Sequence, residues 1–456
     1  MTKGRLSPHC SVNVLKRSRL VSEIPVWEVS LNSVQVLYGR GTVSVAVPEN
    51  ISCEVIRKPL VDPLADPRAT IRLCLEQAFE EDRFQRSVAK ADSACIVVCD
   101  ITRPVPNHLF LRPMIEALCA RGVPYHRIRI LVATGLHRPN VGEELEELIG
   151  DNWVLENIRI DNHDASDDQN HVTLGRTPTR NTPVRLNRHL VESDLKIVTG
   201  LVEPHFMAGY SGGRKVIAPG VAHSETIRTF HSARFMDDPN ATNCNFAGNP
   251  LHEEQLEIVK MLGEVFALNT VIDEHRRLTR VNFGEVVESH NAMVQQVRGE
   301  CEVKIGRRFS TVLTSAAGYP LDRTYYQTIK GMVGALGILQ PGGDLIIASA
   351  CSEGFGSTPF RDAQKRLVKE GPEVFLSHLL DKPLASTDEW QTQKQLAPMK
   401  HGTVYLYTDG LSEDEKVLTG VQCVSDLQSA VEASLNRQSF PSLAVIPEGP
   451  YVIPHV

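Results

Sequence analysis

The sequence predicts an α/β protein made of two α/β domains with mostly parallel sheets and an active site in the cleft between them. Short β-branched or leucine-rich runs recur along the chain, and each ends in a polar turn that contains Gly or Pro. Helical patterns lie between these runs, which is typical of α/β units. The length of 456 residues exceeds that of one typical core, so two domains are expected.

The first predicted element is a hairpin, because two β-rich runs flank "GRG" in "VQVLYGRGTVSVAVPE". In the next run, "CIVVC", Cys95 and Cys99 are expected to lie in a buried strand and to form neither a disulfide nor a metal site. Pro113 is predicted to open a helix that Gly122 ends. The strand-and-turn segments are "CIVVCDITRPVPN", "IRILVATGLHRPN", "LKIVTGLVEPH", "STVLTSAAGYP" and "DLIIASACSEGFG".

Three further stretches define the expected organisation. Residues 161–187 are polar and predict a hairpin with loops, and "NPLHEEQLEIVKMLGEV" predicts a helix. Residues 272–309 predict a helical connector to a second α/β unit that begins near Ser310. The chain is therefore divided into four parts: an N-terminal extension (1–30), a first α/β domain with the cofactor-binding motifs (31–300), a second α/β domain (301–440) and a tail that returns to the first domain (441–456).

Composition narrows the class of function. The net charge of −7 argues against nucleic acid as a partner, and the chain contains no apolar run that could cross a bilayer. The basic first twenty residues lack the apolar core of a secretory signal, although they leave an organellar transit peptide open. The ten cysteines are scattered, so reduced thiols and a cytoplasmic location are expected.

Ligands of open α/β sheets bind beyond the carboxyl ends of the strands, so the polar turns are expected to converge. In "CDITRP", Asp100 and Arg103 either form a structural ion pair or bind a ligand, with Arg103 holding a carboxylate or phosphate. In "ATGLHRP", His137 projects from a loop of the kind that carries catalytic groups.

The stretch "VEPHFMAGYSGGRKVIAPG" combines His205 with a glycine-rich turn, and its Arg214 and Lys215 favour an anion. It lacks the spacing of a Walker A loop, so the simpler alternative is a phosphate nest with an incidental histidine. His231, in "TIRTFHSARFM", suggests a structural role when taken alone.

Two motifs of the second half complete the candidates. In "YYQTIKG", Tyr326 and Lys330 lie four residues apart and share a helical face, which is also the pattern of a solvated helix start. Trp390 lies among polar residues, where it either packs half-buried at the surface or stacks on a flat cofactor.

Taken together and in this order, "DITRP", "ATGLHRP", "EPHFMAGYSGGRKVIAPG", "FHSARF" and "YYQTIKG" resemble the nickel-pincer-nucleotide-dependent lactate racemase family. The likeness extends from about Val34 to the C-terminal "EGPYVIP", and only the N-terminal extension falls outside it. The resemblance implies a racemase or epimerase of a short 2-hydroxy acid, with lactate as the default substrate. It implies reversible hydride transfer to the nucleotide, through a 2-keto acid.

The resemblance also implies roles for residues. The cofactor is a nickel complex of a pyridinium-3-thioamide-5-thiocarboxylic acid mononucleotide, built by dedicated biosynthesis enzymes. Its nickel would be bound by His231, and Lys215 would be the residue that can join it covalently. His137 and His205 would be the catalytic acid–base pair. The other implied contacts are cofactor binding by Asp100, Thr102, Gly212, Gly213 and Trp390, and substrate binding by Arg103, Tyr326, Gln327 and Lys330.

Two alternatives belong to other classes. The first is a zinc-dependent hydrolase or lyase that binds its metal through His137, His205 and His231, although these residues include no closely spaced histidine pair. The second is a non-catalytic module that binds a nucleotide or an organic acid. Such a module would need the glycine-rich loop but not the histidines.

Overall fold

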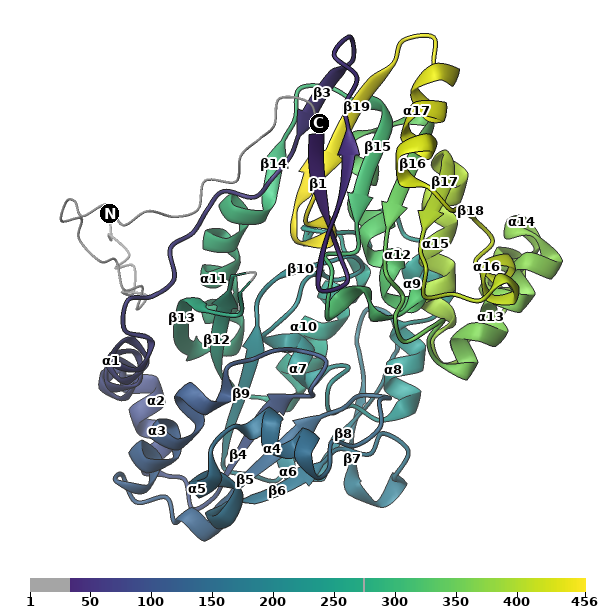
Figure 1. Ribbon diagram of the computed structural model, residues 1–456. Helices are drawn as coiled ribbons and strands as arrows, with labels where there is room; N and C mark the ends of the chain where they lie inside the picture. Colours follow the sequence, from purple (N-terminus) through teal and green to yellow (C-terminus); the bar gives the residue numbers. More distant parts are fainter. Residues whose placement is uncertain (1–32, 274) are drawn as a thin grey trace, which may run out of the picture.

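The computed structural model describes residues 33–273 and 275–456, which Figure 1 shows in colour. The N-terminal extension predicted for residues 1–30 lies outside the described residues. The predicted hairpin is confirmed, because β1 (Ser33–Tyr38) pairs antiparallel with β2 (Gly41–Ala46). Gly39 has a φ of +54° at its turn, a conformation that glycine adopts easily.

The first large sheet has six strands and is mostly parallel, as predicted. Its strands are β4 (Ala94–Cys99), β5 (Ile128–Ala133), β6 (Arg159–Asn162), β9 (Leu195–Leu201), β12 (Phe266–Ile272) and β13 (Leu278–Glu285). They lie in the order β13-β12-β9-β4-β5-β6, and only β12 and β13 are antiparallel neighbours.

Helices cover both faces of this sheet, which explains why its strands are apolar throughout. In β4, Ile96 and Val98 face one core while Cys95 and Val97 face the other. Cys95 and Cys99 are free thiols, as expected. The helices of the first face are α1 (Pro67–Glu80), α2 (Asp82–Ala89), α3 (Asn107–Cys119), α4 (Glu143–Ile149) and α5 (Asn152–Asn157). Those of the second face are α6 (Arg188–Val191), α7 (Arg214–Ile217), α8 (Ser224–Phe230), α9 (Ala233–Met236) and α10 (Pro250–Leu262).

Two local predictions were wrong. Helix α3 begins at Asn107 and contains Pro113, because Phe110 already packs on the sheet and this burial offsets the hydrogen bond that proline removes. The connector expected to be helical over residues 272–309 includes strand β13, whose Phe283 packs in the core; only α11 (Val286–Cys301) is helical there. The predicted hairpin within residues 161–187 is confirmed as β7 (His171–Arg176) and β8 (Pro183–Asn187).

The second large sheet is parallel throughout. Its strands are β3 (Ser52–Val55), β15 (Phe309–Ser315), β16 (Leu339–Ala348), β17 (Thr403–Tyr407), β18 (Gln422–Val424) and β19 (Ser442–Ile446). They lie in the order β18-β17-β16-β15-β19-β3. The helices of this unit are α12 (Tyr325–Gly334), α13 (Thr358–Glu370), α14 (Pro372–Leu380), α15 (Glu389–His401), α16 (Glu413–Leu418) and α17 (Leu427–Arg437). Helix α17 and the β1–β2 hairpin cover one face of the sheet.

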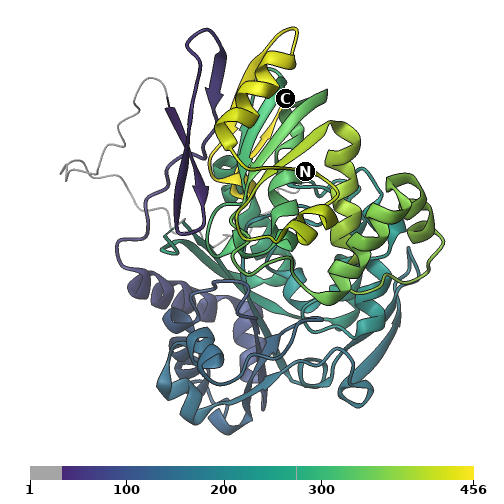
Figure 2. The same ribbon diagram turned by 45° about the vertical axis from the view of Figure 1, so that its right-hand side comes forward.

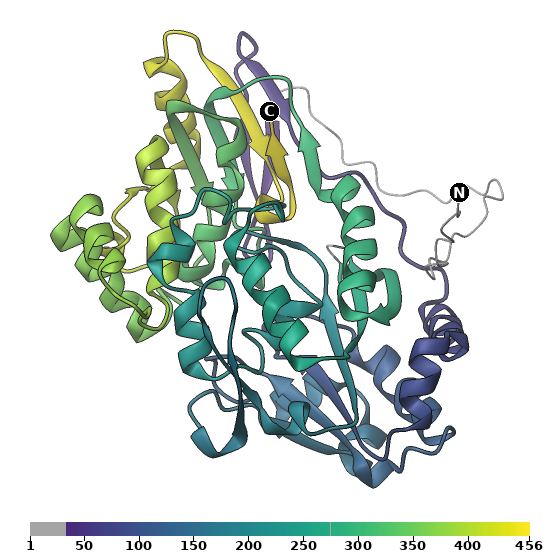
Figure 3. The same cartoon turned by 180° about the vertical axis from the view of Figure 1, so that it is seen from behind.

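The pairing of strands crosses the expected domain boundaries. Strand β3 comes from the N-terminal part of the chain but pairs with β19. Strand β19 was expected in a tail that returns to the first domain; it lies instead inside the second sheet, because Leu443 and Ala444 pack on opposite faces of it. The last strand, β20 (Ile453–His455), pairs with β14 (Glu302–Lys304), which follows α11. Figure 3 shows α11 and β14 from behind.

The two units contact each other through α9 and α15. The ammonium of Lys394 donates to the carbonyls of Met236 at 2.8 Å and Ala241 at 2.7 Å. Arg228 and Ala385 are joined by two hydrogen bonds across the same interface. Figure 2 shows the second unit above the first. Along residues 33–273 and 275–456, the helices all fall short of the length and apolar character that a membrane span requires.

Candidate active site

The predicted polar residues follow strands that are neighbours in the first sheet. β9, β4 and β5 lie side by side. β9 leads to His205, β4 leads to Asp100 and Arg103, and β5 leads to His137. Because the carboxyl ends of parallel strands meet at one edge of a sheet, these loops lie together, as expected.

Asp100 and His137 form a hydrogen-bonded pair. His137 Nδ1 lies 2.6 Å from Asp100 Oδ2, and Thr102 donates to the other carboxylate oxygen at 2.6 Å. The hydrogen bond with Asp100 raises the pKa of His137. Burial opposes ionisation of Asp100, but its bonds to His137 and Thr102 leave its pKa lowered. The carboxylate therefore holds the Nδ1 proton and leaves Nε2 of His137 as an acceptor.

Arg103 lies beside Glu203 rather than in an exclusive pair with Asp100. Its Nε is 3.5 Å from Glu203 Oε1. Burial acts to lower the pKa of Arg103, but Glu203 and then Asp100 leave it raised. A guanidinium has five N–H donors, so this contact leaves donors for a carboxylate ligand.

His205 is buried and differs from His137 in the atoms that hold it. Its Nδ1 accepts hydrogen bonds from the backbone N–H groups of Met207 at 3.3 Å and Ala208 at 3.2 Å. Burial, followed by the charges of Lys215 and Arg103, places its pKa well below the ordinary value. A neutral ring whose Nδ1 accepts must carry its proton on Nε2.

Two lysines approach from different units. Lys215 is in α7 of the first unit and Lys330 is in α12 of the second. Burial and the charge of Arg103 lower the pKa of each to about 7. Arg103, Lys215 and Lys330 are therefore close enough for their charges to act on one another, which is an arrangement suited to anionic ligands.

His231 follows α8 and is 7% exposed. Its Nδ1 donates to the carbonyl of Ile227 at 2.9 Å, so the lone pair of the neutral ring is on Nε2. Burial and the charge of Lys215 lower its pKa to about 3, so the ring is neutral. The ring of Trp390 lies 4.9 Å away, and Trp390 is 8% exposed. Trp390 therefore lines the interior beside His231 and is not a half-buried surface residue.

The glycine pair packs against the protein itself. A Cβ on Gly212 would lie 2.8 Å from the Val202 side chain, and one on Gly213 would lie 2.7 Å from the His290 ring. Both glycines have positive φ. Arg214 is 1% exposed and donates to the carbonyl of Ala208 at 2.9 Å. The expectation that Arg214 meets an anion was wrong, because its side chain turns into the first unit.

Helix α12 presents the predicted residues of the second unit. Gln391 donates to the carbonyl of Tyr326 at 2.6 Å. Burial, and then Asp388, raises the pKa of Tyr326, so its phenol stays protonated. Gln327 Oε1 is buried, and no hydrogen-bond partner for it lies within the described residues. An acceptor of this kind fits a ligand that donates a hydrogen bond.

Sequence reasoning missed three residues beside the site. Glu203 follows β9 as His205 does, so the strand-end rule could have identified it. Asp388 is close enough for its charge to act on both His137 and Tyr326, and it accepts a hydrogen bond from Ser357 at 2.5 Å. Tyr451 lies in the short helix η5 (Gly449–Tyr451), and its pKa is raised by burial and by Glu203. No sequence pattern pointed to Asp388 or Tyr451.

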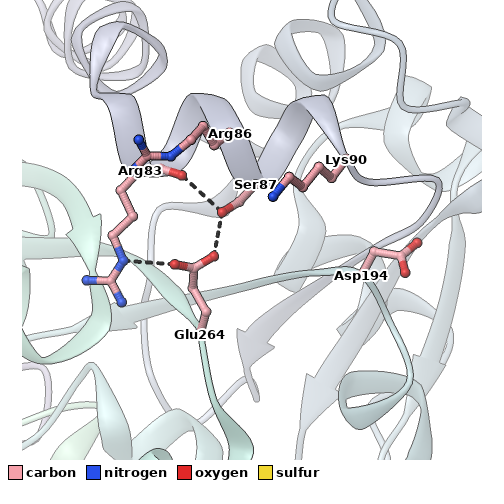
Figure 4. A pocket seen from close by; sticks show the side chains of 6 residues that line it. All are labelled: Arg83, Arg86, Ser87, Lys90, Asp194 and Glu264. Carbon is pink, nitrogen blue, oxygen red and sulfur yellow. Dashed lines mark hydrogen bonds and ion pairs between the residues drawn. The ribbon is translucent and has the colours of Figure 1, made fainter.

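A separate pocket near α2 is not part of this site. Figure 4 shows its charged lining, in which Glu264 accepts hydrogen bonds from Arg83 and Ser87. None of the residues singled out from the sequence lines this pocket. Its lining residues are Arg83, Arg86, Ser87, Lys90, Asp194 and Glu264.

The histidines do not form a conventional metal site. Within the described parts of the chain, no three His, Cys, Asp or Glu side chains are grouped so as to hold a metal ion. The three-histidine zinc arrangement of the alternative hypothesis is therefore not formed. The free Nε2 of His231 suits a metal whose other ligands come from a cofactor.

Fold and site together define an α/β enzyme with two units. Its candidate site contains two histidines, His137 and His205, and three cationic residues. Comparison with protein-family models identifies the family of this enzyme. Residues 38–243 match the lactate racemase N-terminal domain, and residues 307–454 match the lactate racemase C-terminal domain. The chain belongs to the lactate racemase family, and membership makes it an isomerase.

Individual relatives agree with this assignment. The lactate racemase of Lactiplantibacillus plantarum is 29% identical over 394 residues, which are 84% of this chain and 90% of the relative. That of Thermoanaerobacterium thermosaccharolyticum is 29% identical over 390 residues, 84% of this chain and 89% of the relative. The apoprotein structure of a lactate racemase from the latter organism has a TM-score of 0.86 at 27% identity, covering 93% of this chain and all of that one. A Thermotoga maritima protein shares the fold, with a TM-score of 0.61 at 20% identity over 87% of this chain and 99% of that one.

Proposed function

We propose that this protein racemises a short 2-hydroxy acid, with lactate as the first candidate, in the cleft formed by His137, His205 and the three cations. The substrate loses its hydroxyl proton and the hydride on Cα, which gives a planar 2-keto acid. Return of both to either face gives either enantiomer. A nickel-pincer nucleotide, when bound, supplies the acceptor for the hydride.

The observation that carries this proposal is the different state of the two histidines. His137 has its Nδ1 proton held by Asp100, so its Nε2 can take the hydroxyl proton of the substrate. His205 is held at Nδ1 by backbone N–H groups, so its Nε2–H can donate a hydrogen bond to the substrate oxygen while that oxygen changes between hydroxyl and carbonyl. We therefore assign the transfer of the hydroxyl proton to His137 and the hydrogen bond that holds the same oxygen to His205.

Two of the three cations are placed to bind the substrate. We infer that Arg103 and Lys330 hold the substrate carboxylate, with Tyr326 and Gln327 as hydrogen-bonding neighbours. Arg103 retains its charge beside Glu203 and suits the carboxylate. Gln327 Oε1 is buried with an open acceptor site among the described residues, so it suits the substrate hydroxyl rather than the carboxylate.

The residues also fit the cofactor. His231 offers a neutral Nε2 whose ring is oriented by the Ile227 carbonyl, as metal-binding histidines usually are. A pKa of about 7 leaves much of Lys215 as the free amine at neutral pH, which is the nucleophilic form that a covalent link to the cofactor would need. We place Trp390, Asp100 and Thr102 around the nucleotide. Gly212 and Gly213 stay a prediction as cofactor contacts, since packing against the protein already requires them.

A cytoplasmic enzyme is the simplest setting for this proposal. The nine cysteines of the described residues are all free thiols. The partners that we propose are the small 2-hydroxy acid and the enzymes that build the nucleotide, with no nucleic acid or membrane involved.

The test uses protein made with and without the cofactor-building enzymes. We expect the former to contain nickel and to convert one enantiomer of lactate into the other, and the latter to do neither. His231→Ala should lose nickel, whereas His137→Ala should keep it and lose roughly 10²–10⁴-fold in rate. Stoichiometric zinc in place of nickel, or ligand binding without turnover in the nickel-loaded protein, would favour the hydrolase or the binding module instead.

A further inference from the structure

Arg214 is a buried cation that the proposed reaction does not use. It is 1% exposed, and among the described residues no carboxylate contributes to its pKa. Burial lowers its pKa to about 9. Its guanidinium lies 4.7 Å from the centre of the Phe246 ring. Burying a charge without an ionic partner is costly, so its side chain must make contacts that offset this cost.

Those contacts are with the loop that carries His205. Arg214 donates through one terminal nitrogen to the carbonyls of Ala208 at 2.9 Å and Tyr210 at 3.5 Å. The Tyr210 N–H donates to the same Ala208 carbonyl at 3.0 Å, so Ala208–Tyr210 forms a tight turn with Arg214 against it. Strand β11 (Gly209–Tyr210) lies within this turn and pairs antiparallel with β10 (Pro204–His205).

Ala208 connects Arg214 to His205. Its carbonyl accepts from Arg214, and its N–H donates to Nδ1 of His205 at 3.2 Å. The bond to Nδ1 determines which nitrogen of His205 carries the proton. The guanidinium of Arg214 therefore affects the tautomer of His205 through Ala208, which is hydrogen-bonded to both side chains.

His290 of α11 holds Arg214 from the other side. The other terminal nitrogen of Arg214 is 3.3 Å from His290 Nδ1, and His290 Nε2 is 2.7 Å from the Ser211 carbonyl. A carbonyl can only accept, so Nε2 of His290 donates and Nδ1 accepts from Arg214. The His290 ring also lies against Gly213, where a Cβ would come within 2.7 Å of it. The loop thus contacts His290 at two places beyond Arg214.

We propose that Arg214 and His290 are positioning residues that fix the loop of residues 205–215 so that His205 presents its Nε2–H to the cleft. Neither residue touches the substrate in this account. The role of His205 as hydrogen-bond donor to the substrate rests on the proposed function, but the effect of Arg214 on the tautomer of His205 does not.

The first test therefore needs no cofactor. Apo-protein labelled with ¹⁵N-histidine is studied by NMR, and His205→Asn identifies the signal of His205. We expect an Nε2–H tautomer in the unmodified protein and a mixture of tautomers in Arg214→Gln. Arg214→Lys keeps the charge and one donor but cannot reach both Ala208 and His290, so it should lie between the two. An unchanged His205 signal in Arg214→Gln would overturn the proposal.

The second test uses the nickel-loaded protein. Arg214→Gln should lower kcat by about 10²-fold, the scale expected for a displaced catalytic group, while KM and nickel content change little. Gly213→Ala should lower kcat by a similar factor. Should Arg214→Gln fail to fold, Arg214→Lys and His290→Gln take its place, and they should lower kcat by a smaller factor. Equal losses in kcat and in nickel content would show a general collapse of the loop and contradict a positioning role.

Two control variants separate positioning from strain. Gly142 has a φ of +59° and open space around its Cβ position, so Gly142→Ala reproduces the backbone strain of Gly213→Ala without a contact to His290. Arg280 of β13 pairs with Glu300 of α11 rather than with the loop, so Arg280→Lys tests the loss of a guanidinium elsewhere. Both should keep the kcat of the unmodified protein. A loss in Gly142→Ala as large as in Gly213→Ala would remove His290 from the explanation.

Discussion

At the scale of single residues, two side chains of the same type are held by different hydrogen-bond partners. His137 and His205 are both histidines after strand ends, yet a carboxylate holds one and two backbone N–H groups hold the other. The polar turns identified both residues from the sequence, because residues after parallel strands gather at one edge. The inward turn of Arg214 could not be predicted, because it depends on His290, which is 76 positions away.

Asp100→Asn tests the pair at His137. Removing the carboxylate charge removes the main cause of the raised pKa of His137, so that pKa should fall. If Nε2 of His137 must be unprotonated to accept the hydroxyl proton, the acidic limb of kcat/KM then moves to lower pH. The maximal rate should also fall, since the ring loses its orientation. The pH profile of the nickel-loaded variant measures both effects, and an unmoved acidic limb would exclude His137 as the titrating group.

Lys215 and Lys330 provide a test of the cationic cleft without catalysis. With pKa values of about 7, both should be methylated by formaldehyde and borohydride at pH 7.5 before the exposed Lys365. Arg103→Gln removes a cation that depresses both values, so methylation of both should slow. Peptide mass spectrometry of apo-protein gives the rates. Methylation of Lys365 before Lys215 and Lys330 would mean that burial and Arg103 do not lower the pKa of these two lysines.

At the scale of elements, continuous apolar runs with abrupt polar ends predicted β4, β5, β9, β15 and β16, because such runs are typical of sheets covered on both faces. The other strands of the two large sheets were not identified from the sequence. Strand β13 was missed because its charged residues interrupt the alternation and it lies next to a true helix, α11. The start of α3 was misplaced because proline marks helix starts more often than interiors, and burial of Phe110 decided otherwise here. In β13 and at the start of α3, tertiary packing therefore determined the structure more strongly than the local sequence pattern.

The turn after β9 makes a prediction at this scale. Gly212 has a φ of +78°, and a Cβ there would meet Val202 at 2.8 Å. Gly212→Ala should therefore lower the free energy of unfolding by more than the roughly 1–2 kcal/mol of a positive φ alone. Gly420→Ala is the matched control, because Gly420 has a φ of +69° and its nearest neighbour is at 3.5 Å. Equal urea midpoints for the two variants would show that the turn is not tightly packed.

At the scale of the whole molecule, the site exists only where the two units meet. His231 and Lys215 come from the first unit, and Lys330 and Trp390 come from the second. The sequence predicted two α/β units and a cleft but could not assign β3 and β19 to one sheet. Strand partners far apart in the chain leave no local pattern.

Lys394 is the residue with which to test this junction. Its ammonium donates to carbonyls of Met236 and Ala241 in the other unit, so Lys394→Met leaves two buried acceptors without that donor. A loss of about 1–3 kcal/mol in the free energy of unfolding is expected. Lys365→Met breaks only an exposed ion pair with Asp362 and should change stability by less than about 0.5 kcal/mol. If the two variants unfold at the same urea concentration, Lys394 does not join the units.

The central proposal is that a hydride leaves Cα of a 2-hydroxy acid bound in this site and returns to either face of the planar 2-keto acid. The most direct measurement gives the nickel-loaded protein one enantiomer of lactate with deuterium on Cα, in ordinary water, and follows both chirality and label. We expect racemisation slowed by the deuterium, with most of the label still on Cα in the product. Racemisation with extensive loss of deuterium to water would show a carbanion route and contradict the account.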